Sequence, residues 1–316
     1  MKSKLRDSDL SKLVTEQQNP RTLHLDEMTA LEIAEVINRE DRKVADCVTQ
    51  ALPEIAKTID LVAGVLANAG RLIYVGAGTS GRLGALDAAE IPPTFDISAK
   101  QVLHLIAGGK KALYSAVEDE EDSLHLGQKD IARQKPSKKD VVIGIAASGR
   151  TPYTLAALAY AKKKGARTVA VVCNAKSPLE EVADLAIVVD VGAEVLSGST
   201  RMKAGTAQKM VLNMISTGAM VRLGYVYDNL MVNVLPRNKK LRERGITIVE
   251  KVTGVNHEKA AHALKTASGR IPVALVMLKT SASKAEAERA LNASGGQVRK
   301  AIEIIRNASG FKGAQL

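Results

Sequence analysis

Aromatic side chains are scarce in this chain, and tryptophan is absent. The 316 residues include two Phe, six Tyr and no Trp, so aromatics make up 3% of the sequence. A surface on which nucleic-acid bases stack is therefore poorly supplied. The net charge of +11 raises the question of nucleic-acid binding, but the chain has no zinc-ligand spacing and no evident helix-turn-helix. Excess positive charge fits an anionic small molecule equally well, so we expect no nucleic-acid partner.

Long apolar runs and paired cysteines are also missing. The longest apolar stretches are far shorter than the ~20 residues that a membrane-spanning helix needs, and the N-terminus is polar and charged, without the apolar core of a signal peptide. Cys47 and Cys173 have no metal-ligand spacing. We therefore expect a cytoplasmic protein with buried free thiols, no membrane contact and no metal site. The hydrophobic content of 46% is ordinary for a globular protein.

One strand–loop–helix pattern stands out, and it occurs twice. Residues 72–75 form a short apolar run typical of a buried strand, followed by a glycine-rich loop (76–81) and a segment of helical composition. Glycines allow a tight turn, and the first N–H groups of a helix bind anions. Residues 140–145 lead in the same way into a second loop, and Pro152 opens its helix. Two such loops suit a phosphorylated small molecule held from two sides. The contacts that we expect are Gly78, Thr79, Ser80, Ser148, Gly149, Arg150 and Thr151.

Two simpler interpretations of the loops remain open. Hydroxyl residues at these positions are often helix N-caps and nothing more, although capping requires neither two hydroxyls per loop nor a repeat of the loop. The first loop also matches the dinucleotide fingerprint G-x-G-x-x-G, which is weak by itself. The acidic residue that should end the next strand would be Asp96, but Pro92 and Pro93 before it do not make a convincing strand. We therefore favour contact with a phosphorylated ligand.

Apolar strands alternate with helices through the middle of the chain. This alternation predicts an α/β fold with a doubly wound parallel sheet of about five strands, flanked by helices on both faces. In such sheets the ligand lies beyond the carboxyl ends of the strands, where both loops are found. We expect Pro92 and Pro93 to end the first-loop helix. The expected strands are 72–75, 102–106, 140–145, 168–173 and 186–191.

Three domains are expected. Residues 1–52 form an N-terminal helical arm that packs on the main domain, residues 53–247 form the main domain, and residues 248–316 form a small helical unit. The basic, polar stretch from Lys239 onwards is expected to be a hinge. The C-terminal helices are expected at 257–266, 273–278, 284–293 and 297–306.

Acidic residues near the loops are the candidates for acid/base chemistry. Glu90 has apolar neighbours on the first-loop helix, so we expect it to be partly buried with a raised pKa. The acidic run 118–122 is ambiguous, because charge runs are usually solvated. Glu194 directly follows the fifth strand and begins a hydroxyl-rich segment with Ser199 and Lys203. We expect these three residues to contact the substrate as well.

The loops resemble those of the sugar isomerase (SIS) domain, a family of phosphosugar binders. The resemblance is carried by Gly76-Ala77-Gly78-Thr79-Ser80-Gly81-Arg82 and by Ala147-Ser148-Gly149-Arg150-Thr151. Longer blocks at 78–93, 144–153 and 192–213 are similar to the N-acetylmuramic acid 6-phosphate etherases of bacterial cell-wall recycling. The segment from Thr15 to Asp41 and the C-terminal unit resemble the same family, so the likeness covers nearly the whole chain.

The resemblance implies a carbon–oxygen lyase of amino sugar catabolism. Its reaction would cleave the D-lactyl ether at C3 of N-acetylmuramic acid 6-phosphate, giving N-acetylglucosamine 6-phosphate and D-lactate. It further implies a homodimer and no metal or organic cofactor. Glu90 matches the family's acid/base glutamate after the first loop, and Glu121 matches the second catalytic glutamate. The C-terminal unit resembles a three-helix module of the ubiquitin-associated (UBA) type.

Two functions of other classes remain open at this point. The first is an aldose–ketose isomerase on the same domain, with Glu194 as its base. The second is a non-catalytic phosphosugar sensor that regulates a partner protein, which needs the loops but not the paired glutamates. The sequence does not indicate which glutamate is the acid and which is the base.

Overall fold

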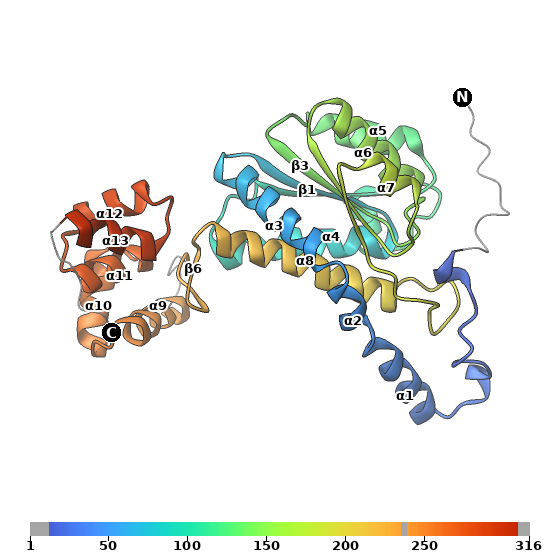
Figure 1. Cartoon of the computed structure of the whole chain (residues 1–316), viewed down its shortest axis with the longest axis horizontal. Coiled ribbons are helices and arrows are strands. Elements are labelled where there is room, and N and C mark those ends of the chain that lie inside the picture. The colour runs from blue at the N-terminus through green and yellow to red at the C-terminus, as the bar shows by residue number, and fades with distance from the viewer. Residues whose placement is uncertain (1–12, 235–238, 309–316) are drawn as a thin grey trace. The chain divides into compact units, whose positions relative to one another are not determined.

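Contacts between residues divide the chain into two units. The computed structural model describes residues 13–234 and 239–308 (Figure 1). Unit 1 comprises the described residues 13–90 and 99–216, and unit 2 comprises 91–98, 217–234 and 239–308. The expected boundary between residues 247 and 248 falls inside α9 (Lys239–Thr253). The stretch from Lys239 is therefore a helix rather than the expected hinge, because Ile246 and Val249 give it a buried apolar face.

A five-stranded parallel sheet forms the centre of unit 1. The strand order is β2-β1-β3-β4-β5, and every neighbouring pair is parallel. The strands are β1 (Arg71–Gly76), β2 (Val102–Ile106), β3 (Asp140–Ile145), β4 (Arg167–Val172) and β5 (Leu185–Val188). The doubly wound parallel sheet is confirmed, and the five strands lie within a few residues of their predicted positions. Both loops follow strands next to each other in the sheet, since β1 pairs with β3.

Helices cover both faces of this sheet. They are α3 (Leu52–Ala67), α4 (Gly78–Phe95), α5 (Leu124–Arg133), α6 (Pro152–Lys163), α7 (Pro178–Val182) and α8 (Lys203–Arg222). Figure 1 shows α6 and α7 on one face and α3, α4 and α8 on the other. Side chains of β1 alternate between the faces: Ile73 and Val75 share a core with Leu158 of α6, whereas Tyr74 lies against Gly84 of α4.

Short helices precede the sheet, and a buried ion pair connects them to α8. They are η2 (Val14–Glu16), η3 (Leu25–Glu27), α1 (Ala30–Asp41) and α2 (Val44–Thr49). A capping box between Thr29 and Glu32 starts α1, because each side chain satisfies a backbone N–H that has no partner in the helix. At the other end of α1, Glu40 is 2% exposed and accepts a hydrogen bond from Lys203 Nζ at 3.0 Å. Lys43 and Asn19 also donate to this carboxylate.

The two consecutive prolines do not end the first-loop helix, contrary to the expectation. α4 continues through Pro92 and Pro93 to Phe95. The φ angle of proline is compatible with a helix, and its cost comes from the missing N–H and a clash with the preceding turn. Here the prolines lie in the last turn, so only the carbonyls of the turn before them lose partners. These are the carbonyls of Ala88, which is buried, and of Ala89, which is exposed.

Unit 2 is helical and has its own apolar core. Its elements are β6 (Val226–Tyr227), β7 (Leu230–Met231), α9, α10 (His257–Thr266), α11 (Ile271–Thr280), α12 (Lys284–Ala293) and α13 (Val298–Ala308). α10 and α12 coincide with their predicted ranges, and all four predicted helices are present. The core includes Val249, Leu264, Leu275 and Leu291 from four of these helices. The likeness to a UBA module stays a prediction.

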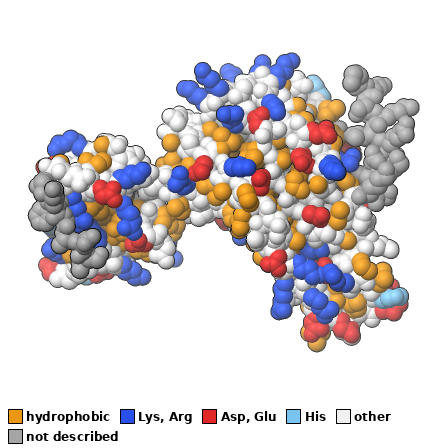
Figure 2. All heavy atoms as spheres, viewed as in Figure 1, with side chains coloured by type: hydrophobic (Ala, Val, Ile, Leu, Met, Phe, Trp, Pro, Cys, Tyr) orange, Lys and Arg blue, Asp and Glu red, His pale blue; other side chains and the backbone are white. Residues whose placement is uncertain are grey.

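The described ranges contain no helix that is long and apolar enough to cross a bilayer. On the face of unit 1 that Figure 2 shows, Lys and Arg side chains are most frequent along the upper edge and on the lower arm, and they lie among Asp and Glu in the middle.

Candidate active site

The first loop is a tight connection between β1 and α4. β1 ends at Gly76, and α4 begins at Gly78, which has a positive φ of 50°. Gly81 is required by space, because a Cβ there would lie 2.6 Å from Ile106 Cγ1. The loop is therefore followed directly by a helix, and the first N–H groups of this helix have no acceptor within it. These N–H groups lie beside Thr79 and Ser80, so the geometry is compatible with the anion site expected from the sequence, which stays a prediction.

The start of α8 packs against this loop. A Cβ on Gly205 would lie 3.5 Å from Thr79 Cγ2, so the first turn of α8 touches the loop. The Ser80 hydroxyl donates to Gln208 Oε1 at 2.9 Å, and both residues are buried. Gln208 was not predicted from the sequence. Its only signal there is a polar residue at an inward position of an apolar helix.

The second loop holds its hydroxyls in two different ways. The Ser148 hydroxyl accepts a hydrogen bond from the Arg150 backbone N–H at 3.2 Å. Thr151 is the N-cap of α6, but its side chain makes no capping hydrogen bond to that helix. Gly149 has a φ of 65° and leaves no room for a side chain, since a Cβ would lie 2.3 Å from Ser177 Oγ. Helix capping alone therefore does not explain Thr151.

Arg150 carries a buried donor without a partner. Within the described residues, its Nε is buried and has no hydrogen-bond acceptor. An unpaired buried donor costs about 1–3 kcal/mol, and more when the group is charged. An anion in this loop would provide the missing acceptor, since a guanidinium matches phosphate oxygens well.

Glu121 lies between the two loops. A Cβ on Gly78 would lie 3.0 Å from Glu121 Oε1, so the carboxylate reaches the first loop. The Glu121 carbonyl accepts a hydrogen bond from the Tyr153 N–H at 3.0 Å, in the first turn of α6. The following helix, α5, continues along α6: a Cβ on Gly127 would lie only 2.1 Å from the Tyr153 carbonyl oxygen. The backbone of the acidic run is thus fixed at the second loop while its carboxylate points to the first.

The surroundings of Glu121 favour its protonated form. Partial burial raises the pKa of this carboxyl, and the charges of Asp122 and Glu118 raise it further. Arg82 opposes them; its guanidinium donates to the carbonyls of Ala112 and Ser115 and so fixes the segment before the acidic run. A carboxyl with a raised pKa can give or take a proton near neutral pH.

Glu90 lies elsewhere, and the expectation that it is partly buried is wrong for the single chain. It is exposed on α4, twelve residues beyond Gly78. At a helical rise of 1.5 Å per residue this is a separation of about 18 Å along the axis. Since the Glu121 carboxylate is at Gly78, about three turns of α4 separate it from the backbone of Glu90.

The inward side chain one turn before Glu90 belongs to a polar cluster. Asp87 is 4% exposed and accepts hydrogen bonds from Tyr74 (2.7 Å), Asn213 (2.9 Å) and Ser216 (3.0 Å). Burial raises the pKa of this carboxyl although these hydrogen bonds oppose the shift. The cluster joins β1, α4 and α8, so it fixes the helix surface from which Glu90 projects.

The remaining predicted contacts lie beside α8. Glu194 is fully buried, and its two oxygens accept hydrogen bonds from the backbone N–H groups of Lys203 (3.0 Å) and Ala204 (2.9 Å). A carboxylate at this place satisfies the start of the helix and complements its dipole. The Lys203 ammonium is 2% exposed and pairs with Glu40. Ser199 is half-buried in the loop between them.

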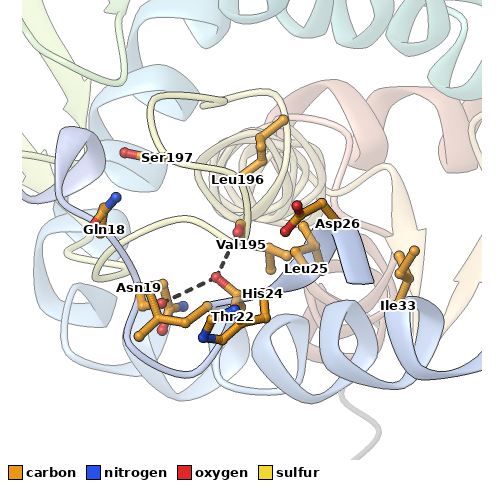
Figure 3. Close-up of a pocket in the computed structure, with 11 residues that line it drawn as sticks. Gln18, Asn19, Thr22, His24, Leu25, Asp26, Ile33, Val195, Leu196 and Ser197 are labelled. Carbon is orange, nitrogen blue, oxygen red and sulfur yellow. Dashed lines mark hydrogen bonds between the residues drawn. The ribbon is translucent and has the colours of Figure 1, made fainter. Parts of the chain in front are cut away.

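A cavity of about 500 Å³ lies in the N-terminal part of unit 1, beside the loop that follows Glu194 (Figure 3). Segments 18–26 and 195–197 form most of its wall, and Thr22 donates to the Val195 carbonyl at 2.8 Å. None of the predicted site residues lines it. Across the described residues, no three His, Cys, Asp or Glu side chains come together as a metal site would require.

The geometry also separates this site from a dinucleotide site. In that motif an acidic residue ends the second strand. Here β2 ends at Ile106 and runs into Ala107 and Gly108, whereas Asp96 follows the end of α4. Neither the position of Asp96 nor the second loop fits a dinucleotide.

Two family models match the chain. The model described as the glucokinase regulatory protein N-terminal SIS domain matches residues 54–162, and the SIS domain model matches residues 129–217. The parallel sheet and its paired loops are therefore those of a SIS-domain protein.

Curated relatives identify the particular family. N-acetylmuramic acid 6-phosphate etherase 1 of Bacillus licheniformis is 49% identical, and the match covers 96% of this chain and all of the relative. The etherase of Lactobacillus johnsonii is 49% identical over 93% of this chain and 99% of its own length. Etherase 2 of Vibrio parahaemolyticus is also 49% identical, over 93% and 98% of the two chains. The chain belongs to the N-acetylmuramic acid 6-phosphate etherases.

Proposed function

We propose that this chain cleaves the D-lactyl ether at C3 of N-acetylmuramic acid 6-phosphate, giving N-acetylglucosamine 6-phosphate and D-lactate. Membership of the etherase family supports the substrate and the reaction. One structural observation carries the assignment of the site: the Glu121 carboxylate lies at Gly78 while its backbone is bonded to the start of α6. An ionisable group is thus held between two anion-binding loops.

The loops bind the phosphoryl group in this proposal. The N–H groups that open α4 and the hydroxyls of Ser80 and Thr151 would donate to its oxygens. Arg150 would place its unpaired Nε–H on the same group. Binding the phosphoryl group fixes the sugar, which brings the reacting carbon and the catalytic carboxyl together before reaction.

The chemistry needs an acid and a base. The hydrogen at C2 becomes acidic when the sugar ring opens, because it then lies next to the C1 aldehyde. A base removes this proton, an acid protonates the departing lactate oxygen, and water adds to C3 of the unsaturated intermediate. Such proton transfers contribute about 10²–10⁴ in rate per group. The raised pKa of Glu121 suits it to this exchange, and these steps need no organic cofactor.

Glu90 enters the site from a second copy of the chain in this proposal. It is exposed, and its backbone lies about 18 Å along α4 from Gly78, where the Glu121 carboxylate of the same chain lies. In a symmetric dimer each copy would complete the site of the other with the same pair of surfaces. The homodimer expected from the resemblance would in this way bring the two glutamates to one substrate.

Two further parts of the proposal concern the rival isomerase and the compartment. Glu194, the base of an isomerase on this domain, has both oxygens occupied by backbone N–H groups, which leaves it poorly placed for proton transfer.

We place the reaction in the cytoplasm, since Cys47 and Cys173 are both free thiols, as is usual in a reducing compartment.

A lactate assay tests the function directly. The purified protein is incubated with N-acetylmuramic acid 6-phosphate in ²H₂O, and released D-lactate is measured enzymatically. We expect turnover, with solvent deuterium at C2 of the product because a base has removed that hydrogen. Tight binding without lactate release would replace the enzyme by a sensor, and turnover of fructose 6-phosphate instead would favour the isomerase.

A further inference from the structure

Gln208 has an unusual position for a polar side chain. It lies in the second turn of α8 and is 1% exposed. Its Oε1 accepts the hydroxyl proton of Ser80 at 2.9 Å. Its Nε2 is buried and has no hydrogen-bond partner among the described residues. The amide oxygen of Gln208 therefore accepts a hydrogen bond from the Ser80 hydroxyl, whereas its NH₂ group makes none among the described residues.

This direction of the Ser80 hydroxyl is compatible with a loop that holds no ligand, but not with a loop that binds a phosphoryl group. To bind a phosphoryl oxygen, Ser80 has to donate its only proton to that oxygen. While the proton points to Gln208 Oε1, the hydroxyl can offer the anion only lone pairs, which repel it. An acceptor on α8 thus competes with the ligand for the proton.

A half-turn of the amide plane removes the competition. The turn exchanges the two amide atoms, so Nε2 becomes a donor to Ser80 Oγ and gains the partner that it lacks. The Ser80 hydroxyl accepts this bond and has its proton free for the phosphoryl oxygen. Hydrogen bonds in such a chain polarise one another, so the amide also makes Ser80 a better donor.

We propose that Gln208 is a positioning residue for phosphoryl binding: its amide turns when the substrate arrives and directs the Ser80 hydroxyl proton to the phosphoryl group. The inference rests on the proposed function only in taking the first loop as the phosphoryl site. It adds a residue that touches no substrate atom and acts entirely through Ser80.

Two substitutions at this position separate the proposal from simple packing. Gln208→Met keeps the length of the side chain but can neither donate nor accept in this way, so Ser80 loses the bond that orients and polarises its hydroxyl. We expect KM to rise about three- to tenfold, the loss of one neutral hydrogen bond, with kcat within about twofold. Gln208→Glu keeps the shape but only accepts when ionised, so KM should rise further. At lower pH the introduced carboxyl gains a proton and can donate, which should reverse part of the increase.

A double-mutant cycle with Ser80→Ala is the decisive measurement. In the Ser80→Ala background the same Gln208→Met change should alter KM less than twofold, because the hydroxyl through which Gln208 acts is absent. The inhibition constant of inorganic phosphate should follow KM through the series. Gln101→Met is the matched control, since the Gln101 amide donates to the Leu66 carbonyl away from the loops, and its KM should stay at the wild-type value.

The opposite results would overturn the inference. If the Gln208→Met and Ser80→Ala effects multiply, the two residues act independently. If Gln208→Met lowers kcat at constant KM, its role is not in phosphoryl binding. Thermal unfolding of each variant shows whether the fold is intact. Lactate release by the wild type tests the function separately, so failure of this inference and failure of the proposed function are distinguishable.

Discussion

Glu121 and Glu90 are both matched to catalytic glutamates by sequence, but the chain holds them in different ways. Glu121 lies on an irregular segment that contacts both loops, and neighbouring charges raise its pKa. Glu90 projects from the side of α4 and is exposed. Asp87, one turn earlier on α4, is hydrogen-bonded to Tyr74 and Asn213. The chain by itself therefore prepares one carboxyl for chemistry and leaves the other on the surface.

This difference has a physical reason. A side chain on a loop that is bonded to two elements can be placed at the junction of both. A side chain three turns along a helix is carried away from the helix N-terminus by about 5.4 Å per turn. A site that needs both the N-terminus and a residue three turns later can be completed only by another surface. In the proposed function, the two glutamates therefore meet only when a second copy of the chain is present.

Substitution of Glu121 should have the largest effect. Glu121→Gln keeps the shape and removes the ionisable group, so kcat for lactate release should fall by about 10³. Glu120→Gln, one residue earlier in the same acidic run, is the matched control and should keep at least about half of the wild-type rate. If both variants turn over equally, Glu121 is not the acid/base residue and the comparison fails.

Glu90→Gln should lose nearly as much, by about 10²–10³ in kcat, but its defect should be repaired in a hybrid. When Glu90→Gln and Glu121→Gln chains are co-expressed with different tags, the purified hybrid dimer has one intact site out of two. It should show about half of the wild-type rate. A hybrid as inactive as its parents would mean that Glu90 acts within its own chain.

Glu40 is a third carboxyl, and its hydrogen-bond partners Lys43, Lys203 and Asn19 lie outside both loops. Burial alone would raise the pKa of Glu40, but hydrogen bonds from Lys43, Lys203 and Asn19 outweigh it and lower the pKa to about 2. Glu40→Gln leaves Lys203 buried without its counter-charge, so the free energy of unfolding at neutral pH should fall by about 3 kcal/mol. Glu35→Gln, exposed on the same helix, should change it by less than about 0.5 kcal/mol.

The pH dependence of this stabilisation follows from the direction of the shift. The pKa of Glu40 is lower in the folded chain than in the unfolded chain, where a glutamate has a pKa of about 4.3. The stabilisation is therefore complete above the unfolded pKa and is lost as the pH falls through the folded pKa. Urea unfolding of the wild type and Glu40→Gln should show curves that converge between about pH 4.3 and 2. Curves that stay parallel would contradict the ion pair.

The smallest effect is expected from the charge environment of Glu121. Glu118 is exposed, and its negative charge raises the pKa of Glu121. Glu118→Gln removes this repulsion, so the limb of the pH–rate profile that reports Glu121 should move to lower pH. The direction is the same whether Glu121 is the base, on the acidic limb, or the acid, on the alkaline limb. Glu35→Gln changes the net charge equally and should leave the profile in place; a shift to higher pH in Glu118→Gln would contradict the assignment.

Local patterns were sufficient for most of the fold. Apolar runs located the five strands, and the periodicity located α10 and α12, whose N-caps in the structure are Asn256 and Ser283. They failed at two places, one because prolines are compatible with the last turn of a helix and one because burial in a core decides. The prolines at 92 and 93 should end a helix by local rules, but α4 continues, and the stretch from Lys239 becomes helical because its apolar face is buried in the core of unit 2.

The site divides in the same way. The two loops could be predicted because each is local: a strand, a tight turn and a helix N-terminus are contiguous in sequence, whereas their anion binding stays a prediction. The burial of Glu90 was predicted wrongly from apolar neighbours, because on a helix the nearest residues in sequence do not share its face. Glu194 binds the backbone at the start of α8, and Gln208 of the same helix binds Ser80. Local patterns could not predict the second contact, because Ser80 and Gln208 are more than 100 residues apart in the sequence.

Residues close together in the chain were enough to predict the strands and the two glycine-containing loops, and long runs of matching residues were enough to place the chain in its family. The folded chain was needed to show that Glu121 lies between the loops and that Glu90 is exposed three turns along α4. The reason is geometric. Spacing along the chain sets the direction of a side chain within its own element, but the packing of elements decides which side chains meet.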